Sequence, residues 1–220
     1  MHRAPRVVGL AFGVSIGLLV LLVGPLLLFN PWFVSTLQAR HAVPAAFSAT
    51  RAEIDTVTGS VLADLFTGGD FAVTLNERPL LDDAERSHMA DVSWLVRLLV
   101  VAAVVAALVA ALSGTLLRGE PRRMAGALLT TALIIGAAAL VLAVVFAVAF
   151  EPAFLAFHAI FFPPGTYLFA PGSTLITLFP GGFWFEATLM AGLAVLLSAV
   201  AVGALGLVGR RAPPATSRSA

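Results

Sequence analysis

Residues 94–150 read WLVRLLVVAAVVAALVAALSGTLLRGEPRRMAGALLTTALIIGAAALVLAVVFAVAF and contain two long apolar runs separated by a short polar link. The runs are Trp94–Leu117 and Met124–Phe150, and each exceeds the roughly 20 residues that an α-helix needs to cross the hydrocarbon of a bilayer. The link Arg118–Arg123 is too short for anything but a tight turn. The stretch therefore predicts two antiparallel transmembrane helices.

Two further apolar runs, Val7–Phe29 and Phe185–Val208, bring the prediction to an all-α membrane protein with four spans. The 220 residues are 60% hydrophobic and 11% charged, which is far from the composition of a soluble domain and short enough for one compact unit. The first run is too long for a usual signal peptide, and no small-residue cleavage site directly follows it, so we expect it to be retained. The absence of cysteine excludes disulfides, thiolate metal sites and a thiol nucleophile.

The arginines predict the orientation, because positively charged residues gather on the cytoplasmic side of a membrane. One side of the predicted spans has Glu120 as its only acid, and all other acids lie on the opposite side. We therefore expect both ends of the chain in the cytoplasm, with segments 30–93 and 151–184 outside. The arginines on the expected cytoplasmic side are Arg3, Arg6, Arg118, Arg122, Arg123, Arg210, Arg211 and Arg218.

The first outer segment, 30–93, is expected to be mostly helical. Its apolar residues recur at helical spacing over Thr50–Leu65, with Thr50 as the N-cap and a Gly-Gly-Asp stop at Gly68. Phe71–Leu75 alternates weakly, which indicates a short extended piece. A helix that starts at Asp82 or the next residue is expected to run unbroken into the second span.

The second outer segment, 151–184, contains five prolines and many phenylalanines. We expect an irregular loop close to the membrane surface, a place where such backbone is tolerated. After the last span (185–209), the basic residues 210–220 predict a disordered tail. The expected order is thus 1–29 (N-terminus and span 1), 30–93 (outer), 94–150 (spans 2 and 3), 151–184 (outer), 185–209 (span 4) and 210–220 (tail).

The sequence Gly13-Val14-Ser15-Ile16-Gly17 matches the G-x-S-x-G pattern of hydrolase nucleophiles. That pattern requires a sharp strand-to-helix turn, and here it lies within a predicted span. Helix packing is the favoured interpretation, because glycines four residues apart line one helix face.

Arg97 lies just inside the second predicted span. A charge at that depth is costly, and it either reaches back to lipid phosphates or pairs with a carboxylate. We interpret Arg97 as a candidate lipid-binding residue and leave both partners open.

The stretch Glu85-Arg86-Ser87-His88-Met89-Ala90-Asp91-Val92 places one histidine between two acids. On a helix Glu85, His88 and Asp91 share a face because they are three residues apart. An imidazole between two carboxylates is a candidate base with a fixed tautomer and a raised pKa. A solvated helix face with ordinary ion pairs has the same spacing, so both interpretations remain.

A second histidine, His158, stands among aromatic residues in Phe157-His158-Ala159-Ile160-Phe161-Phe162. It is either an interfacial anchor or a second functional group. His88 and His158 belong to different outer segments at similar depth, and two such groups over a bilayer surface suit chemistry on a lipid ester.

Two patches carry a family resemblance. Glu85 to Val92 resembles an E-x-x-H-M-x-D-V motif of four-span bacterial membrane proteins that include the lipoprotein intramolecular transacylase. His158, Phe161-Phe162, Pro164-Gly165-Thr166-Tyr167 and Leu175-Ile176-Thr177-Leu178-Phe179-Pro180 resemble that family's second signature, with Tyr167 where tryptophan is more usual.

The resemblance implies a membrane acyltransferase that moves the sn-2 acyl chain of a diacylglyceryl-cysteine lipoprotein to that cysteine's amine, leaving a lyso-lipoprotein. It implies an active site at the outer face of the bacterial cytoplasmic membrane, with His88 and His158 as catalytic residues. We expect one histidine to take the amine proton, the other or Tyr167 to support the oxyanion, and Glu85 or Asp91 to orient His88. The expected partners are diacylglyceryl-modified lipoproteins and membrane lipid, with no nucleic acid, cofactor or metal.

Three other classes compete with this interpretation. A non-catalytic scaffold or binding protein would use both histidines as interfacial anchors. A transporter is disfavoured because no predicted span carries a buried acid or base pair. A metalloenzyme could use His88, Asp91 and His158 as zinc ligands.

Overall fold

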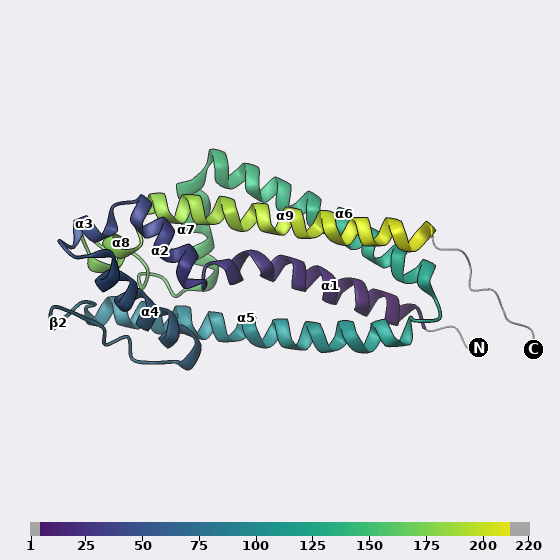
Figure 1. Ribbon diagram of the computed structural model, residues 1–220, viewed down its shortest axis with the longest axis horizontal. Coiled ribbons are helices and arrows are strands. Elements are labelled where there is room, and N and C mark those ends of the chain that lie inside the picture. Colours follow the sequence, from purple (N-terminus) through teal and green to yellow (C-terminus); the bar gives the residue numbers. More distant parts are fainter. Residues whose placement is uncertain (1–4, 212–220) are drawn as a thin grey trace, which may run out of the picture. The chain divides into compact units, whose positions relative to one another are not determined.

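The computed structural model describes residues 5–211, and most of them lie in α-helices (Figure 1). Of the tail 210–220 that was expected to be disordered, Arg210 and Arg211 instead form the end of the last helix, and the rest lies outside the described residues. The elements in chain order are α1 (Arg6–Leu27), α2 (Pro31–Arg40), α3 (Val43–Ala46), α4 (Arg51–Thr67), β1 (Thr74–Leu75), β2 (Arg78–Pro79), α5 (Asp83–Leu116), α6 (Pro121–Val148), α7 (Phe150–Phe161), α8 (Thr174–Leu178) and α9 (Gly181–Arg211).

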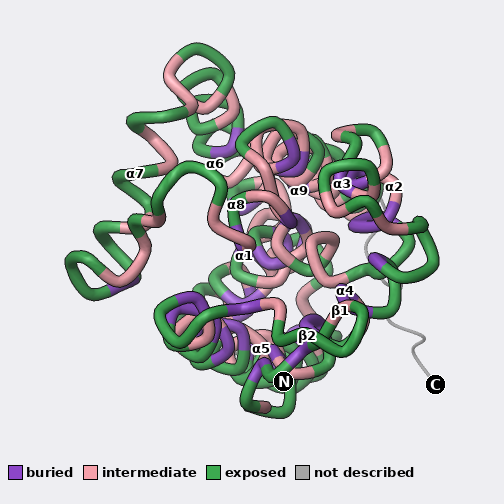
Figure 2. Tube along the Cα trace, turned by 90° about the vertical axis from the view of Figure 1, so that its left-hand side faces the viewer, coloured by how far each residue is buried: buried purple, intermediate pink, exposed green. Residues whose placement is uncertain are grey.

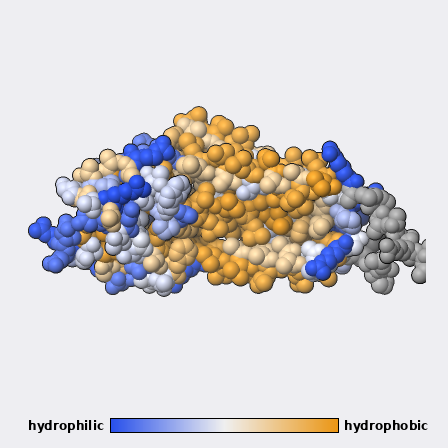
Figure 3. Space-filling view, viewed as in Figure 1, coloured by the Kyte–Doolittle hydropathy of each residue, from blue (hydrophilic) through white to orange (hydrophobic). Residues whose placement is uncertain are grey.

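Four helices, α1, α5, α6 and α9, are long and apolar enough to cross a membrane, as expected from the four apolar runs. Away from their ends, the side chains that these helices expose in Figure 3 are almost all hydrophobic. At 34 residues, α5 is about 51 Å long, whereas a bilayer's hydrocarbon core is about 30 Å thick. Its polar first turns therefore precede the apolar run that starts at Trp94, and the expected continuous helix from Asp83 through His88 is confirmed. The side of the membrane that each end faces stays a prediction.

The chain divides into two compact units, and each long helix contributes to both. One contains Gly24–Ala102 and Val141–Leu193, and we call it the site unit. The other is formed by residues 5–23, 103–140 and 194–211, and we call it the bundle unit.

The bundle unit shows what the glycines of the first span do. A Cβ atom at Gly13 would lie 3.1 Å from Oγ1 of Thr131 on α6, and the Thr131 hydroxyl donates a 2.9 Å hydrogen bond to the Gly13 carbonyl. On the opposite side of α6, a Cβ at Gly206 would lie 2.7 Å from Cγ of Leu129. Ser15 is buried within the continuous helix α1, without a strand-to-helix turn. The packing interpretation of the G-x-S-x-G pattern is confirmed.

The site unit has a single large hydrophobic core, built where α2, α3, α4 and α8 gather beside the first turns of α5 (Figure 1). A buried amide side chain ties three of these elements together. Gln38 on α2 donates to the Leu178 carbonyl on α8 at 3.1 Å and accepts from the Thr58 hydroxyl on α4 at 3.0 Å. Polar side chains lie outside this core, over α2, α4 and the β1–β2 hairpin (Figure 3).

The predicted helix of the first outer segment is confirmed as α4, with the expected caps. The Thr50 side chain accepts from the Glu53 amide while the Glu53 carboxylate accepts from the Thr50 amide, and Gly68 ends the helix with a φ of 73°. The extended piece expected over Phe71–Leu75 is shorter than predicted. Its last two residues pair with β2 in a hairpin whose two turn residues both have positive φ.

The second outer segment differs from the expected irregular loop. It begins with the 12-residue helix α7, includes the short helix α8, and is irregular only around them. Pro152 stands in the first turn of α7, where a missing N–H costs no helical hydrogen bond, and the next proline is Pro163. Because Pro152 cannot continue the helix from the preceding turn, α6 ends at Val148, two residues before the predicted end of the third span. No residue of α7 is buried, as Figure 2 shows.

Candidate active site

Two histidines from distant parts of the sequence meet in the site unit. His88 lies in the second turn of α5 and His158 in the third turn of α7. Their ring centroids are 6.0 Å apart and their planes differ by 26°, so the rings are nearly parallel. The structure thus brings together the two residues that the sequence analysis singled out as catalytic candidates.

His88 is buried, with an exposed fraction of 6%, and its neighbours are aromatic. The rings of Phe162 and Phe169 meet it edge-on at centroid distances of 4.9 and 5.6 Å. Its Nδ1 atom is buried and has no hydrogen-bond partner among residues 5–211. Such surroundings favour the uncharged imidazole, because a buried charge without a partner is costly.

Neither of the two acids on either side of His88 forms the predicted orienting interaction with its ring. Glu85 is 1% exposed, but its carboxylate turns to the backbone: Oε1 accepts from the Leu175 amide at 2.7 Å and Oε2 from the Asp82 amide at 3.0 Å. Asp91 is half-buried, and within the described part of the chain no hydrogen bond or ion pair joins it to His88. The expectation that these carboxylates fix the tautomer of His88 and raise its pKa is wrong. Backbone amides take the nearer carboxylate, and burial lowers the pKa of His88 to about 4, with a smaller effect of the same sign from His158.

His158 has a defined proton position. Its Nδ1 lies 2.8 Å from the Phe154 carbonyl, which can only accept, so we assign the hydrogen to Nδ1 and an open lone pair to Nε2. Burial lowers the pKa of His158 below its ordinary value, although the bond to Phe154 acts in the opposite direction. The ring is therefore neutral at physiological pH, and Nε2 is available as a base.

Tyr167 and two phenylalanines complete the surroundings of the histidines. The Tyr167 ring lies 5.3 Å from the His158 ring, and Phe162 is within 5.4 Å of the same ring. The sequence analysis named Tyr167, quoted Phe162 within the family signature without giving it a role, and missed Phe169. The dense phenylalanine content of segment 151–184 was the available signal, and it did not say which rings face inward.

The expected lipid-binding residue, Arg97, is exposed on α5. Its guanidinium lies against the end of α4, where a Cβ atom at Gly68 would come within 2.9 Å of one of its nitrogens. No ion pair joins Arg97 to an acid within residues 5–211. A carboxylate was one of the two partners considered for Arg97, and the described residues show none.

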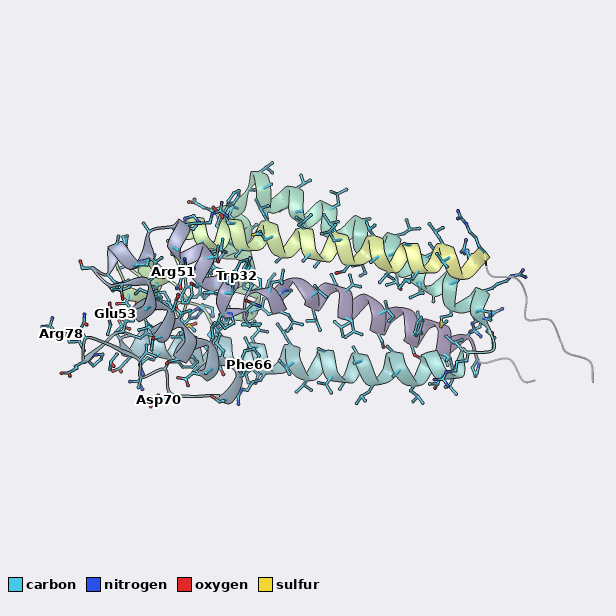
Figure 4. All side chains as sticks on the ribbon, viewed as in Figure 1. Trp32, Arg51, Glu53, Phe66, Asp70 and Arg78 are labelled. Carbon is cyan, nitrogen blue, oxygen red and sulfur yellow. The ribbon has the colours of Figure 1, made fainter. Side chains whose placement is uncertain are left out.

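A hollow of about 430 Å³ between α2 and α4 lies apart from the histidines. Figure 4 labels Trp32 and Arg51 at its rim, and Ser35 accepts hydrogen bonds from the Arg51 guanidinium at 2.9 and 3.1 Å. No histidine lines the hollow, so it adds no acid–base group to the site.

The paired histidines offer uncharged acid–base groups beside apolar walls. Such groups can accept or donate a proton at an uncharged substrate. In the described range 5–211, no three His, Asp or Glu side chains are placed to hold a metal ion, so His88, Asp91 and His158 do not form a ready-made metal site.

Comparisons with known proteins identify one matching family and several similar solved structures. The family model described as lipoprotein intramolecular transacylase Lit matches residues 9–184. No curated protein sequence matches the chain. The membrane-integral lipoprotein intramolecular transacylase Lit from Bacillus cereus, solved in meso, is similar in structure with a TM-score of 0.83 and 19% identity, covering 93% of this chain and 94% of that one. Two structures of the same protein with one histidine replaced, by arginine or by alanine, have TM-scores of 0.75. At this identity the solved structures show a shared fold.

Proposed function

Because this chain belongs to the lipoprotein intramolecular transacylase family, whose model covers residues 9–184, we propose that it transfers an acyl chain within a lipoprotein. The sn-2 acyl group of a diacylglyceryl-modified N-terminal cysteine moves to the α-amine of the same cysteine. The amine nitrogen attacks the ester carbonyl carbon, a C–N bond forms, and the ester C–O bond breaks. The amine proton ends on the released glycerol oxygen, so the product is an N-acylated lyso-lipoprotein with the atoms of the substrate.

The observation that carries the proposal is the pair of stacked histidines, His88 and His158, at 6.0 Å between ring centroids. Direct transfer between two groups of one anchored molecule needs proton movement and positioning but no covalent enzyme intermediate. Two uncharged imidazoles supply that chemistry without the thiol that the chain lacks.

We assign the base to His158, because its Nδ1–H is committed to the Phe154 carbonyl and its Nε2 is open. Nε2 takes the proton from the attacking amine and returns it to the departing glycerol oxygen. An N–H of His88 or the hydroxyl of Tyr167 donates to the oxyanion that forms at the ester carbonyl. Glu85 acts on the site through the backbone of α8 instead of through His88.

The surface of α7 supports a substrate that comes from the membrane. Leu155, Phe157, Ile160 and Phe161 are all exposed on this helix, and Ile160 is 74% exposed. Exposed apolar side chains of this density are stable against lipid and costly in water. We therefore place α7 in the interface of the bacterial cytoplasmic membrane, at its outer face, with His158 near the level of acyl esters.

The test uses the full chain reconstituted with a synthetic diacylglyceryl lipopeptide. Substrate and product are isomers of equal mass, so fragmentation of the N-terminal residue in a mass spectrometer must show where the acyl chain resides. We expect N-acylation by the wild-type chain and its loss in His88→Ala and His158→Ala. The matched control is His41→Ala, because His41 lies at the end of α2 with Nε2 3.3 Å from Glu186 and away from the paired rings.

Full N-acylation in both histidine variants would overturn the assignment. A non-catalytic scaffold predicts the same outcome, because another protein in the preparation would then supply the acyl transfer.

A further inference from the structure

One face of α5 combines apolar, aromatic and cationic side chains outside the histidine site. Trp94, Arg97, Leu98 and Val101 follow the i, i+3, i+4, i+7 pattern of a single helix face. All four are exposed, with exposed fractions of 58% for Trp94 and 59% for Val101. The order along the helix is therefore aromatic, cationic, then apolar, the order of side chains that enter a bilayer from its interface.

The guanidinium of Arg97 has a defined place on this face, although it is exposed. It packs over Gly68, where a Cβ atom would lie 2.9 Å from Nη1 and 3.2 Å from Cζ. Gly68 is also the residue that ends α4 in the left-handed conformation. Phe66, 42% exposed, lies in the last turn of α4 (Figure 4). The neighbourhood thus has two exposed aromatic rings, Phe66 and Trp94, in the elements that meet at Arg97.

Asp64, which lies at the same end of α4 as Gly68, forms no ion pair with Arg97. Asp64, in the last turns of α4, accepts from the Phe71 amide through Oδ2 at 3.0 Å. Within residues 5–211 no carboxylate lies in ion-pair distance of Arg97, and no hydrogen bond to its guanidinium is present. The five N–H donors of a guanidinium suit the oxygens of a phosphate group.

We propose that the surface formed by Phe66, Gly68, Trp94 and Arg97 binds the phosphate of a membrane glycerophospholipid. The phosphate accepts from Arg97, and the two aromatic rings lie beside the glycerol esters. The acyl chains follow Leu98 and Val101 along α5. The diacylglyceryl-cysteine of the proposed reaction contains no phosphate, so this lipid is a different molecule from the substrate, and the site stands independently of the proposed function.

The experiment counts lipids that remain bound to the purified full chain in native mass spectrometry. Nanodiscs containing phosphatidylglycerol are compared with nanodiscs in which part of it is replaced by diacylglycerol. Variants Arg97→Gln and Arg97→Lys keep most of the side chain, and Arg78→Gln in the hairpin is the matched control, since Arg78 is exposed and distant along the chain from α5's apolar run. Inorganic phosphate is added in a separate arm.

We expect the wild-type chain and Arg78→Gln to retain phosphatidylglycerol equally, and Arg97→Gln to retain it about five-fold less. That factor corresponds to about 1 kcal/mol, the usual contribution of one arginine at a membrane surface. Arg97→Lys should fall between them, because lysine keeps the charge and loses the bidentate geometry. The amount of diacylglycerol retained should be the same in Arg97→Gln as in the wild-type chain, because diacylglycerol has no phosphate for Arg97 and can occupy the histidine site instead.

Equal retention by Arg97→Gln and Arg78→Gln would overturn the proposal. So would an equal loss of diacylglycerol in Arg97→Gln, which would show that the contact does not depend on the phosphate. Binding of inorganic phosphate by a wild-type chain that retains no phosphatidylglycerol would also overturn it, because the site would then take free phosphate and not a lipid headgroup.

Discussion

Replacing Glu85 by alanine removes the only side chain that joins the first turn of α5 to the N-terminus of α8 by hydrogen bonds in the described residues. The carboxylate accepts from the Leu175 amide at 2.7 Å and from the Asp82 amide at 3.0 Å, and the side chain is 1% exposed. Leu175 itself is buried in the core of the site unit. The segment held in this way carries Tyr167 and Phe169, which lie beside the histidines.

The magnitude follows from what the deleted carboxylate leaves behind. A buried amide without a partner costs about 1–3 kcal/mol, which applies to Leu175. The Asp82 amide is part-buried at a helix start, where losing a cap costs about 1 kcal/mol. The sum for Glu85→Ala is about 2–4 kcal/mol, a large fraction of the total stability of about 5–15 kcal/mol of a typical protein. Glu85→Gln keeps one accepting oxygen, so we expect about half of that loss.

The assay is unfolding of the full chain in mixed micelles, combined with limited proteolysis of residues 162–173. Both Glu85 variants should unfold earlier than wild type, and cleavage in that segment should become faster in the same order. The matched control is Asp83→Ala, in the same helical turn, whose side chain is fully exposed and should leave both readouts unchanged. Glu85→Ala behaving like Asp83→Ala in both measurements would refute the reasoning.

Two further predictions concern the chemistry. Because burial lowers the pKa of His158 below the ordinary 6.5, Nε2 stays unprotonated into mildly acidic solution. The substrate's α-amine must be uncharged to attack, so its own pKa of about 8 sets the first acid limb of the rate, and His158 should add a second limb only as pH falls through its lower pKa. The contribution of His158 to stability is lost in the same window, since the unfolded chain binds that proton more readily. A second acid limb at or above pH 6.5, beyond that of the substrate amine, would contradict this. Tyr167→Phe should lower kcat by about 10²-fold with little change in KM if its hydroxyl supports the oxyanion; an unchanged kcat assigns that role to His88 alone.

The parts of the fold that could be predicted are those that depend on local sequence. Apolar runs longer than 20 residues predicted four candidate spans, and Thr50, Glu53 and Gly68 marked the ends of α4 because capping involves neighbours only a few residues apart. The sequence did not predict α7, and the reason is also local. The five prolines of segment 151–184 together indicate a loop, whereas Pro152 stands in the first turn of α7 and the other four fall outside that helix.

The candidate site was harder, because its contacts are not local. Spacing alone showed that Glu85 and His88 share a helix face, but it could not show that the partner of Glu85 is an amide 90 positions further along the chain. The predicted topology put His88 and His158 on one side at similar depth, and the family resemblance made both of them catalytic candidates. Neither could show that the two rings meet, since no periodicity joins residues of two separate segments. The phenylalanines that enclose His88 could not be distinguished from their exposed neighbours by composition.

The helix that carries His158 has no buried residue, so the protein core alone does not hold it. If lipid supplies the remaining contacts of α7, the bilayer is a structural component of the catalytic apparatus as well as the source of substrate. Membrane fluidity, thickness and lateral pressure then become determinants of turnover. An enzyme built in this way would couple its rate to the physical state of the envelope, and extraction into detergent would weaken it without changing a single side chain.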